Sequence, residues 1–367
     1  MSWFEIQNID EVDSPALAIY LDRVARNIDK VIKKAGGSAR LRPHVKTHKT
    51  LEIVDLHIKK GVDKFKCATI AEAEMCAMQK AVSVVMAHQL TVSKYNRWAK
   101  LLQSFPNTQF ISVVDNLRTL DDLMVLAKDN NVVLDLALDV NNGMNRSGIR
   151  LGDKAFELCQ RINDSEDLRF VGLHVYDGHI RQSNFAERQQ EGDKDFKNVA
   201  DFIQLLNANN IEVKEVIVGG SPSFPVHANR EHVTLSPGTY VFWDKGYGDK
   251  FQESDFEYAA LVVTRVISVL DEDTICVDLG HKSIASENPH PRVYFLNCEV
   301  EEFLIHSEEH LTIRTKDAKH LKVGDVLYGI PHHICPTVNL NEELAVVEKG
   351  RVTHRWPIVA RKRFLTI

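Results

Sequence analysis

One nine-residue stretch organises the chain: Leu41-Arg42-Pro43-His44-Val45-Lys46-Thr47-His48-Lys49. The sequence Gly36-Gly37-Ser38 breaks the chain before it, and a helical pattern begins after it at Thr50. A short apolar segment followed by a helix places Lys46 just beyond the carboxyl end of a strand. In α/β barrels that end of the strands carries the chemistry. The stretch therefore predicts a barrel with Lys46 at its functional face.

The neighbours of Lys46 indicate what this lysine does. Two histidines, Arg42 and Lys49 lie close to it in the sequence. Nearby cations and partial burial lower the pKa of an amine and free its lone pair for attack on a carbonyl. We therefore interpret Lys46 as a Schiff-base lysine that holds pyridoxal phosphate, with His44 beside the cofactor. The same residues would also suit a solvated basic loop that binds an anion or nothing.

Length and composition limit the number of domains and the classes of function that are possible. A chain of 367 residues can form two domains, one of them a barrel of about 250 residues. The net charge of −6 gives no general attraction to nucleic acid or to an anionic membrane. The first residues lack the features of a signal peptide, and no apolar run approaches the ~20 residues of a membrane span. The six scattered cysteines are typical of free thiols, so we expect a cytoplasmic protein.

Short apolar runs alternate with helical patterns over the first two thirds of the chain. The runs lie at 16–20, 39–44, 64–68, 82–87, 109–114, 132–140, 168–176, 215–218 and 233–235. The helical patterns lie at 22–35, 71–80, 92–102, 117–129, 153–162 and 195–208. This alternation predicts parallel strands covered by helices, as in a (β/α)8 TIM-type barrel.

Nine candidate strands are one more than such a barrel needs, and we assign the run 16–20 to a second domain. From about residue 256, short segments rich in Val, Ile, Leu and Thr are separated by polar turns, which predicts a mainly antiparallel β domain. The predicted barrel spans 21–250. The predicted β domain combines 1–20 with 251–367.

Two loops that follow strands carry candidate cofactor-binding residues. Gly143 and Gly148 allow a tight backbone around Arg146, which can pair with a phenolate, carboxylate or phosphate. After the run 168–176, Tyr176 can cover one face of a flat cofactor, and His179 can serve as a general base. The alternatives are a surface arginine, a core tyrosine and a loop histidine.

Two later loops resemble a phosphate cradle. Glycines let backbone N–H groups approach an anion, and hydroxyl groups add donors. The first loop contains Gly219, Gly220 and Ser221, and the second contains Gly238, Thr239 and Tyr240. Two such loops after successive late strands agree with the phosphate site that is common in these barrels.

A candidate metal pair lies in the predicted β domain, in the sequence Pro331-His332-His333-Ile334-Cys335-Pro336-Thr337. On an extended segment, residues two apart point the same way, so His333 and Cys335 can both bind a borderline cation such as zinc. Two protein ligands leave open positions, which suits a Lewis acid that acts on a substrate oxygen. The alternative is a buried cysteine beside a core histidine.

These motifs together resemble the D-threonine aldolase and D-serine dehydratase family of pyridoxal-phosphate enzymes, which are alanine racemase-like. The matching segments are 42–49, 67–74, 143–148, 218–225, 236–244, 307–310 and 333–337. The resemblance implies a barrel plus a β domain, a homodimer, pyridoxal phosphate on Lys46 and a divalent metal at His333 and Cys335. By position, it implies that Tyr176 lies near the cofactor ring and that Gly220, Ser221, Gly238 and Thr239 bind the phosphate.

Two features of the sequence leave the protonation of the cofactor ring and the identity of the metal undecided. Ser236 stands where related barrels can carry a carboxylate that pairs with the pyridine nitrogen. The metal pair occurs in the family as His-x-Asp or His-x-Cys; cysteine favours zinc, members described as aldolases often use manganese, and magnesium is a third option.

The resemblance implies a lyase that acts on a small-molecule D-3-hydroxy amino acid, most simply a D-threonine aldolase that yields glycine and acetaldehyde. Lys46, Tyr176 and His179 are the expected catalytic residues. The alternatives are a dehydratase of D-serine or D-threo-3-hydroxyaspartate, an amino-acid racemase, and a non-catalytic pyridoxal-phosphate-binding protein.

Overall fold

The computed structural model describes residues 2–367, which form two compact units. The barrel unit contains residues 31–46, 51–238 and 362–367. The β unit contains residues 2–30, 47–50 and 239–361. Each unit is described by itself below.

The barrel unit is built on a seven-stranded parallel sheet whose strands follow one another in chain order. The strands are β2 (Lys64–Cys67), β3 (Ser83–Met86), β4 (Gln109–Val114), β5 (Leu134–Val140), β6 (Leu168–Val175), β7 (Glu215–Val218) and β8 (Val233–Leu235). Most strand residues are buried on both faces, as a parallel sheet covered by helices requires. Side chains of β3 to β7 such as Val85, Ile111 and Ile217 meet in one core cluster.

The segment Leu41 to His44 closes the ring between the first and last strands of this sheet. Leu41 forms a parallel bridge with Leu235, and His44 forms one with Lys66. The prediction of a regular strand at 39–44 was wrong, because a 3-10 turn, η2 (Ser38–Arg40), occupies its first part. Pro43 lacks a backbone N–H and cannot donate to a ladder. The barrel-type fold is nevertheless confirmed, since backbone hydrogen bonds join this segment to β8 on one side and to β2 on the other.

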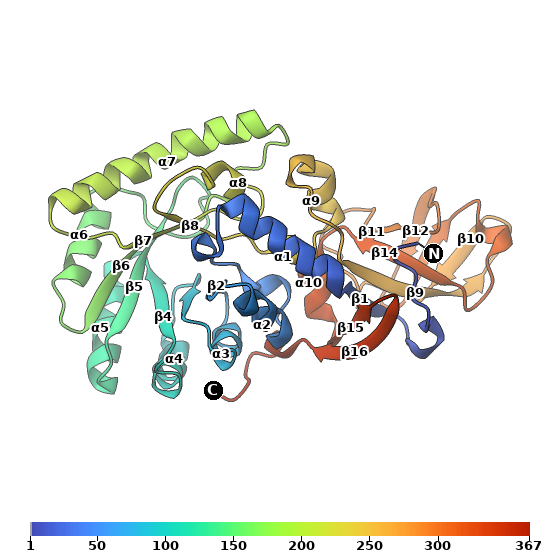
Figure 1. Ribbon diagram of the computed structural model, residues 1–367, viewed down its shortest axis with the longest axis horizontal. Helices are drawn as coiled ribbons and strands as arrows, with labels where there is room; N and C mark the ends of the chain where they lie inside the picture. The colour runs from blue at the N-terminus through green and yellow to red at the C-terminus, as the bar shows by residue number, and fades with distance from the viewer. Residues whose placement is uncertain (1) are drawn as a thin grey trace. The chain divides into compact units, whose positions relative to one another are not determined.

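Helices lie on the outside of the sheet in Figure 1. They are α2 (Leu51–Lys59), α3 (Ile70–Met78), α4 (Val92–Ser104), α5 (Leu117–Asn130), α6 (Asp153–Asn163), α7 (Phe185–Ala208) and α8 (Phe224–His227). The predicted helical segments agree with these bounds within a few residues except at α7. That helix begins ten residues earlier than predicted, where the side chain of Asn184 caps it. The polar run after Phe185 and the buried Gly192 hide its first turns from a periodicity argument.

The β unit contains a nine-stranded sheet whose main path runs β12-β13-β10-β9-β1-β15-β16, with β14 paired to β9 and β11. The strands are β1 (Ala16–Tyr20), β9 (Ala260–Val269), β10 (Thr274–Val277), β11 (Val293–Phe295), β12 (Glu302–His306), β13 (Leu311–Arg314), β14 (Val326–Pro331), β15 (Glu343–Glu348) and β16 (Arg351–Pro357). All pairs are antiparallel except β1 with β15. Ala16–Tyr20 forms a strand of this sheet, and the short helices α9 (Lys245–Lys250) and α10 (Ile334–Leu340) accompany it.

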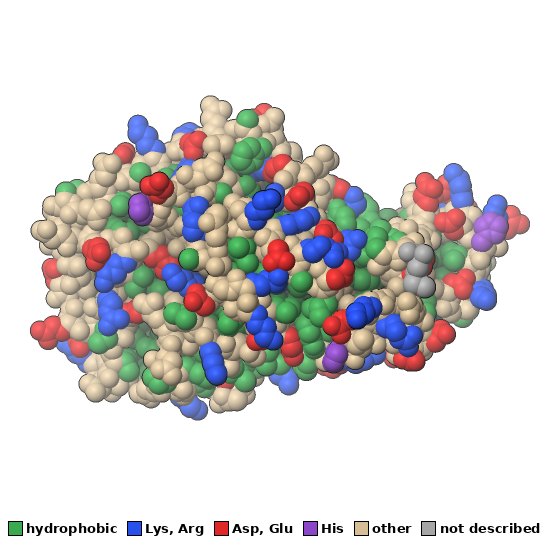
Figure 2. Space-filling model, viewed as in Figure 1, with side chains coloured by type: hydrophobic (Ala, Val, Ile, Leu, Met, Phe, Trp, Pro, Cys, Tyr) green, Lys and Arg blue, Asp and Glu red, His purple; other side chains and the backbone are tan. Residues whose placement is uncertain are grey.

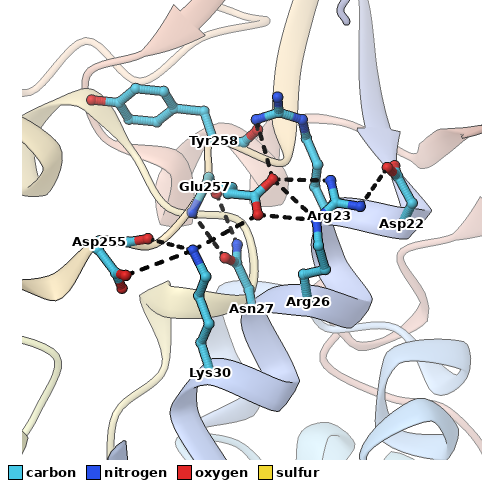
Figure 3. Close-up of polar contacts among 8 residues, drawn as sticks. All are labelled: Asp22, Arg23, Arg26, Asn27, Lys30, Asp255, Glu257 and Tyr258. Carbon is cyan, nitrogen blue, oxygen red and sulfur yellow. Dashed lines mark hydrogen bonds and ion pairs between the residues drawn. The ribbon is translucent and has the colours of Figure 1, made fainter.

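The first half of helix α1 (Leu21–Ala35) is attached to the loop before β9 by a polar network (Figure 3). Glu257 accepts hydrogen bonds from Arg26 and pairs with Arg23 at 3.6 Å. The buried Asn27 holds the backbone of Glu257 from both sides, donating to its carbonyl and accepting from its N–H, each at 2.8 Å. The two backbone hydrogen bonds to Asn27 hold the loop before β9 in place, and the ion pairs of Glu257 add to this attachment.

Positive and negative side chains are interspersed over the face in Figure 2, without an extended patch of one sign. None of the helices in residues 2–367 is both long and apolar enough to cross a membrane. None of the six cysteines is in a disulfide, and five of them are buried.

Candidate cofactor site

Lys46 lies at the carboxyl end of the segment that closes the barrel. It is exposed, and its backbone N–H donates to Nδ1 of His44 at 3.3 Å. His44 itself is buried beside Lys66, its partner across the parallel bridge. Burial and the charges of Lys46 and Lys66 lower the pKa of His44 well below its usual value. His44 is therefore a neutral imidazole next to the predicted Schiff-base lysine.

Two cations lie against the ring of Tyr176, at the end of β6. The guanidinium carbon of Arg146 is 4.6 Å from the ring centroid, and Nζ of Lys66 is 5.5 Å from it. The ring packs closely against two glycines, which leave space for it because they have no side chain. A Cβ on Gly178 would lie 2.4 Å from Cε1 of Tyr176, and one on Gly220 would lie 3.0 Å from its Cε2. The structure thus brings Arg146 and Gly220, two of the candidate cofactor-binding residues, to the ring of Tyr176.

A buried histidine–aspartate pair lies in the same cluster. Nδ1 of His174, on β6, is 2.7 Å from Oδ1 of Asp139, on the neighbouring strand β5. Burial lowers the pKa of His174. Burial also acts to raise the pKa of Asp139, but the contacts of Asp139 with His174, Ser147 and Arg146 together outweigh burial and lower it. The pair is therefore a neutral imidazole bonded to a carboxylate. Nε2 of His174 is buried and has no hydrogen-bond partner among the described residues.

A second buried pair shapes the predicted phosphate loop. Nε2 of His227 is 2.6 Å from Oδ2 of Asp177, and the hydroxyl group of Ser223 donates to the other carboxylate oxygen. That hydroxyl group also accepts from the N–H of Gly220 at 3.1 Å. Asp177 therefore fixes the loop after β7 from the neighbouring strand. Its pKa is lowered because hydrogen bonds from His227 and Ser223 outweigh its burial.

The two predicted phosphate loops meet within the barrel unit. The N–H of Gly238 donates to the hydroxyl group of Ser221 at 3.2 Å. Gly219 has φ +75°, a conformation that favours glycine, and a Cβ there would lie 3.2 Å from Cα of Phe224. This close backbone approach agrees with an anion cradle formed by Gly219, Gly220, Ser221 and Gly238.

The other two residues of the second loop lie in the β unit. Tyr240 is completely buried, its ring centroid 5.7 Å from that of Phe256, and burial raises the pKa of its phenol well above the usual value. It has the surroundings of a core residue. The hydroxyl group of Thr239 lies 3.9 Å from Sγ of Cys335, which places Thr239 beside the predicted metal pair.

His179, the predicted general base, is directed toward helix α7. Its Nε2 is 2.8 Å from Oδ2 of Asp195, and a Cβ on Gly143 would lie 2.7 Å from the same nitrogen. Among the described residues, no hydrogen bond joins His179 to Lys46, Lys66 or Tyr176. His174, in contrast, lies in the cluster of His44 and Lys66.

The predicted metal pair is brought together by a helix and not by an extended segment, so that part of the prediction was wrong. His333 is the residue directly before α10, and Cys335 lies in the first turn of that helix. Pro336 is tolerated there, because the first N–H groups of a helix have no intrahelical partner. Burial lowers the pKa of His333, but its contacts with Cys335 and Glu287 prevail and raise it to about 9.

Polar groups of the β unit surround this pair. Asp244 caps α9 and accepts from the N–H of Ile334 at 3.1 Å; burial raises its pKa to about 6. The hydroxyl group of Thr47 lies 3.2 Å from Sγ of Cys335. Within residues 2–367, no group of three or more His, Cys, Asp or Glu side chains has the geometry of a metal site. The pair alone supplies two ligands.

Four residues of the site were not found from the sequence: Lys66, Asp139, His174 and Asp177. A signal was present, because Lys66, Asp139 and His174 are polar residues inside apolar strands that are buried on both faces. A charged residue at such a position needs a partner or a ligand. The sequence does not show that these residues are in contact; they meet because their strands lie side by side in the folded barrel.

Two family comparisons match the chain. The family described as alanine racemase, N-terminal domain, matches residues 19–245. The chain belongs to this family. A second description, putative serine dehydratase domain, matches residues 259–347 of this alanine racemase family member. The resemblance predicted from the motifs is therefore confirmed, and so is the fold class.

Individual relatives cover nearly the whole chain. A 3-hydroxy-D-aspartate aldolase of Paracoccus denitrificans (strain Pd 1222) is 27% identical over 96% of this chain and 92% of its own length. A D-threonine aldolase of an Arthrobacter species is 27% identical over 95% and 93%. The crystal structure of D-threonine aldolase from Filomicrobium marinum has a TM-score of 0.87 with 26% identity, and 95% of each chain is covered.

Proposed function

We propose that this protein is a pyridoxal-phosphate- and divalent-metal-dependent lyase that acts on D-3-hydroxy amino acids. The observation that carries the proposal is the position of Lys46 at the carboxyl end of the barrel strands, close to the buried Lys66 and the exposed Arg146 that lie against the ring of Tyr176. The names of the relatives support the reaction class, since aldolases of two D-3-hydroxy amino acids align over most of the chain.

The residues of the barrel unit fit pyridoxal phosphate. Lys46, Lys66 and Arg146 bring three basic side chains to the cluster, whereas Asp139 and Asp177 are already engaged by His174 and His227. An anionic cofactor would offset this positive charge. Tyr176 offers a flat face between two cations, and the glycine loop at 219–220 leaves no side chain that would block a phosphate.

Bound through a lysine, pyridoxal phosphate acts as an electron sink for bonds at the Cα of an amino acid. The side chains of the protein therefore have to bind the cofactor and to donate and accept protons beside it. Lys46 supplies the amine, and Tyr176 holds one face of the ring. Arg146 offers a guanidinium to a phenolate or carboxylate. His174, neutral and oriented by Asp139, presents an unpartnered Nε2 that can accept a proton.

We assign the divalent metal to His333 and Cys335. Imidazole and thiolate are ligands of zinc, and two protein ligands leave positions for a substrate oxygen. Thr47, whose hydroxyl group contacts Cys335, directly follows Lys46 in the sequence. Binding of a metal at this pair would require the ligand atoms of His333 and Cys335 to lose their protons.

We favour a D-threonine aldolase, with glycine and acetaldehyde as products, over a dehydratase. The dehydratase alternative has one specific observation in its favour, the match of residues 259–347 to a putative serine dehydratase domain. Both reactions use an imine, an electron sink and a Lewis acid, so the two differ in which bond at Cα or Cβ breaks.

A product assay tests the proposal. Protein loaded with pyridoxal phosphate and a divalent metal is incubated with D-threonine and with D-serine, and glycine, aldehyde, 2-oxo acid and ammonia are followed together. We expect glycine and acetaldehyde from D-threonine. Ammonia with 2-oxobutanoate or pyruvate would establish the dehydratase instead. Racemisation that a chelator does not reduce would overturn the lyase proposal.

Two sets of variants test the residue assignments. Lys46→Ala is expected to abolish turnover and the covalent attachment of the cofactor. His333→Ala and Cys335→Ala are expected to lower the metal content as well as the activity. Full turnover by the first variant, or unchanged metal content in the others, would contradict the corresponding assignment.

We further propose that the protein is a homodimer in a reducing, cytoplasmic environment. The homodimer rests on the resemblance to the family. The environment is supported by the six cysteines, none of which forms a disulfide.

A further inference from the structure

A carboxylate lies directly against the predicted metal pair, and the proposed function does not use it. Oε1 of Glu287, in the segment between β10 and β11, contacts Nδ1 of His333. The side chains of His333 and Glu287 are 42% and 46% exposed. Because an ion pair that is this open to water contributes little to stability, support of the fold does not explain the contact.

The backbone on each side of this contact is held by one buried hydroxyl group. Thr337, which is completely buried in α10, accepts a hydrogen bond from the N–H of Ala285 at 3.1 Å. The same hydroxyl group donates to the carbonyl of His333 at 2.9 Å. The segment that carries Glu287 is therefore attached to the helix that His333 precedes. Glu287 reaches the imidazole from a position that a buried contact sets.

The contact also decides which nitrogen of His333 is available to a ligand. An ionised carboxylate can only accept hydrogen bonds, so Nδ1 of the imidazole carries the hydrogen that faces Glu287. In a neutral imidazole the other nitrogen, Nε2, then keeps its lone pair. The side chain of Cys335 is within hydrogen-bonding reach of the same imidazole, which places the second predicted ligand beside the ring.

We propose that Glu287 is a positioning residue of the metal pair: its carboxylate holds the Nδ1–H group of His333, so that Nε2 is the nitrogen presented to a divalent metal beside Cys335. A carboxylate behind a metal-bound histidine fixes the orientation of the ring and makes the imidazole a stronger base. Glu287 does not bind the metal itself in this arrangement. The inference rests on the proposed function, because it assumes that His333 and Cys335 bind a metal.

The small number of protein ligands makes this role important. A four-coordinate metal on His333 and Cys335 takes its remaining ligands from water or substrate, so the imidazole supplies one of two bonds to the protein. A half-exposed imidazole without a partner on Nδ1 can rotate and can carry its hydrogen on either nitrogen. We therefore expect metal affinity to depend on Glu287 far more than stability does.

Zinc affinity measures this role without reference to turnover. Protein loaded with pyridoxal phosphate is freed of metal by a chelator and dialysed against buffers of known free Zn²⁺, and Cys335→Ala gives the binding elsewhere in the chain. We expect Glu287→Ala to weaken zinc binding by about 10- to 100-fold. Glu287→Gln is expected to lose less, because its amide oxygen can accept the same hydrogen bond.

Glu348→Ala is the matched control. Glu348 forms a similar half-exposed pair in the β unit, with its Oε2 3.4 Å from Nδ1 of His354. We expect no change in zinc affinity for this variant. In the presence of chelator, thermal unfolding of Glu287→Ala is expected to match that of the parent protein, since the exposed pair adds little to stability.

Cobalt distinguishes a positioning residue from a metal ligand. The visible absorption of Co²⁺ depends on the atoms that are bound to it. At saturating Co²⁺, Glu287→Ala and the parent protein are expected to give the same bands, because His333 and Cys335 remain as the two protein ligands.

Several results would overturn the inference. They are an unchanged zinc affinity in Glu287→Ala, equal losses in Glu287→Ala and Glu287→Gln, an equal loss in Glu348→Ala, cobalt bands altered by Glu287→Ala, and a clearly lower unfolding temperature of Glu287→Ala in chelator. A parent protein that binds no more zinc than Cys335→Ala would instead overturn the metal assignment in the proposed function.

Discussion

At the scale of single residues, the depressed pKa of Lys66 has a consequence for stability. Burial lowers this pKa to about 7 from a value of 10.5. Between these two pH values the unfolded chain binds the proton and the folded chain does not. Stability of the cofactor-free protein therefore rises with pH over this range, and the full cost of the buried ammonium is present below pH 7.

We predict that Lys66→Met stabilises the cofactor-free protein most at about pH 7 and progressively less as the pH is raised toward 10. The slope of the difference is at most about 1.4 kcal/mol per pH unit. Urea unfolding of the two proteins side by side at a series of pH values measures it. A difference that stays constant from neutral to alkaline pH would mean that Lys66 keeps an ordinary pKa.

Gly178 makes room for the ring of Tyr176. A Cβ at this position would lie 2.4 Å from Cε1 of that ring and 2.6 Å from its Oη. We predict that Gly178→Ala displaces the ring and weakens binding of pyridoxal phosphate by about tenfold or more, which corresponds to a loss of about 1.4 kcal/mol or more of binding free energy. Titration of cofactor-free protein, followed by absorbance, measures the affinity.

The matched control for this prediction is Tyr176→Ala. If the clash with Tyr176 causes the effect, then adding Gly178→Ala to Tyr176→Ala weakens binding no further. Fully additive losses in the double variant would show that Gly178 acts through something else.

At the scale of elements, the closing segment of the barrel is held at its base by a buried ion pair. Arg42, which is 1% exposed, donates to both carboxylate oxygens of Glu215 at the start of β7. It also donates to the hydroxyl group of Ser83 on β3. Although Arg42 is near Lys46 in the sequence, its charge is thus already neutralised.

We predict that Glu215→Ala destabilises the protein by about 3–5 kcal/mol, because it leaves the guanidinium of Arg42 buried without a counter-charge. Arg169→Ala is the control. Its partner Asp135 is buried, but the Arg169 side chain is 55% exposed, so we expect a loss of at most about 1 kcal/mol. Denaturant unfolding measures both, and similar losses in the two variants would contradict the role given to Arg42.

The start of α1 offers a second comparison within one network (Figure 3). We predict that Asn27→Ala costs about 1–3 kcal/mol, because the buried N–H and carbonyl of Glu257 both lose their partner. Asp22→Asn removes only an exposed ion pair with Arg26 and is expected to change stability by about 0.5 kcal/mol or less. Equal effects in unfolding experiments would show that the ion pairs, and not Asn27, hold the loop.

At the scale of the whole molecule, the protein is expected to assemble without covalent links between chains. Light scattering on a sizing column is predicted to give twice the chain mass of 41.6 kDa. The same mass is expected with and without a reductant, since no disulfide is present. A monomer, or a mass that falls on reduction, would contradict the prediction.

The sequence by itself determined the class of fold and the positions of the main motifs. Strand and helix periods are local properties, so most elements appear within a few residues of their predicted bounds. Glycine loops and the stretch around Lys46 are local as well, and their combination in order indicated the family.

Tertiary structure decided which polar residues meet. Lys66, His174 and Asp139 come from three different strands, and they share a cluster only because the barrel places those strands around one axis. The sequence did not predict that Arg42 would pair with Glu215, or that a helix would bring His333 and Cys335 together. Such contacts join residues that are far apart in the chain or depend on where a helix begins. The periodic pattern of apolar residues is a local property and does not predict them.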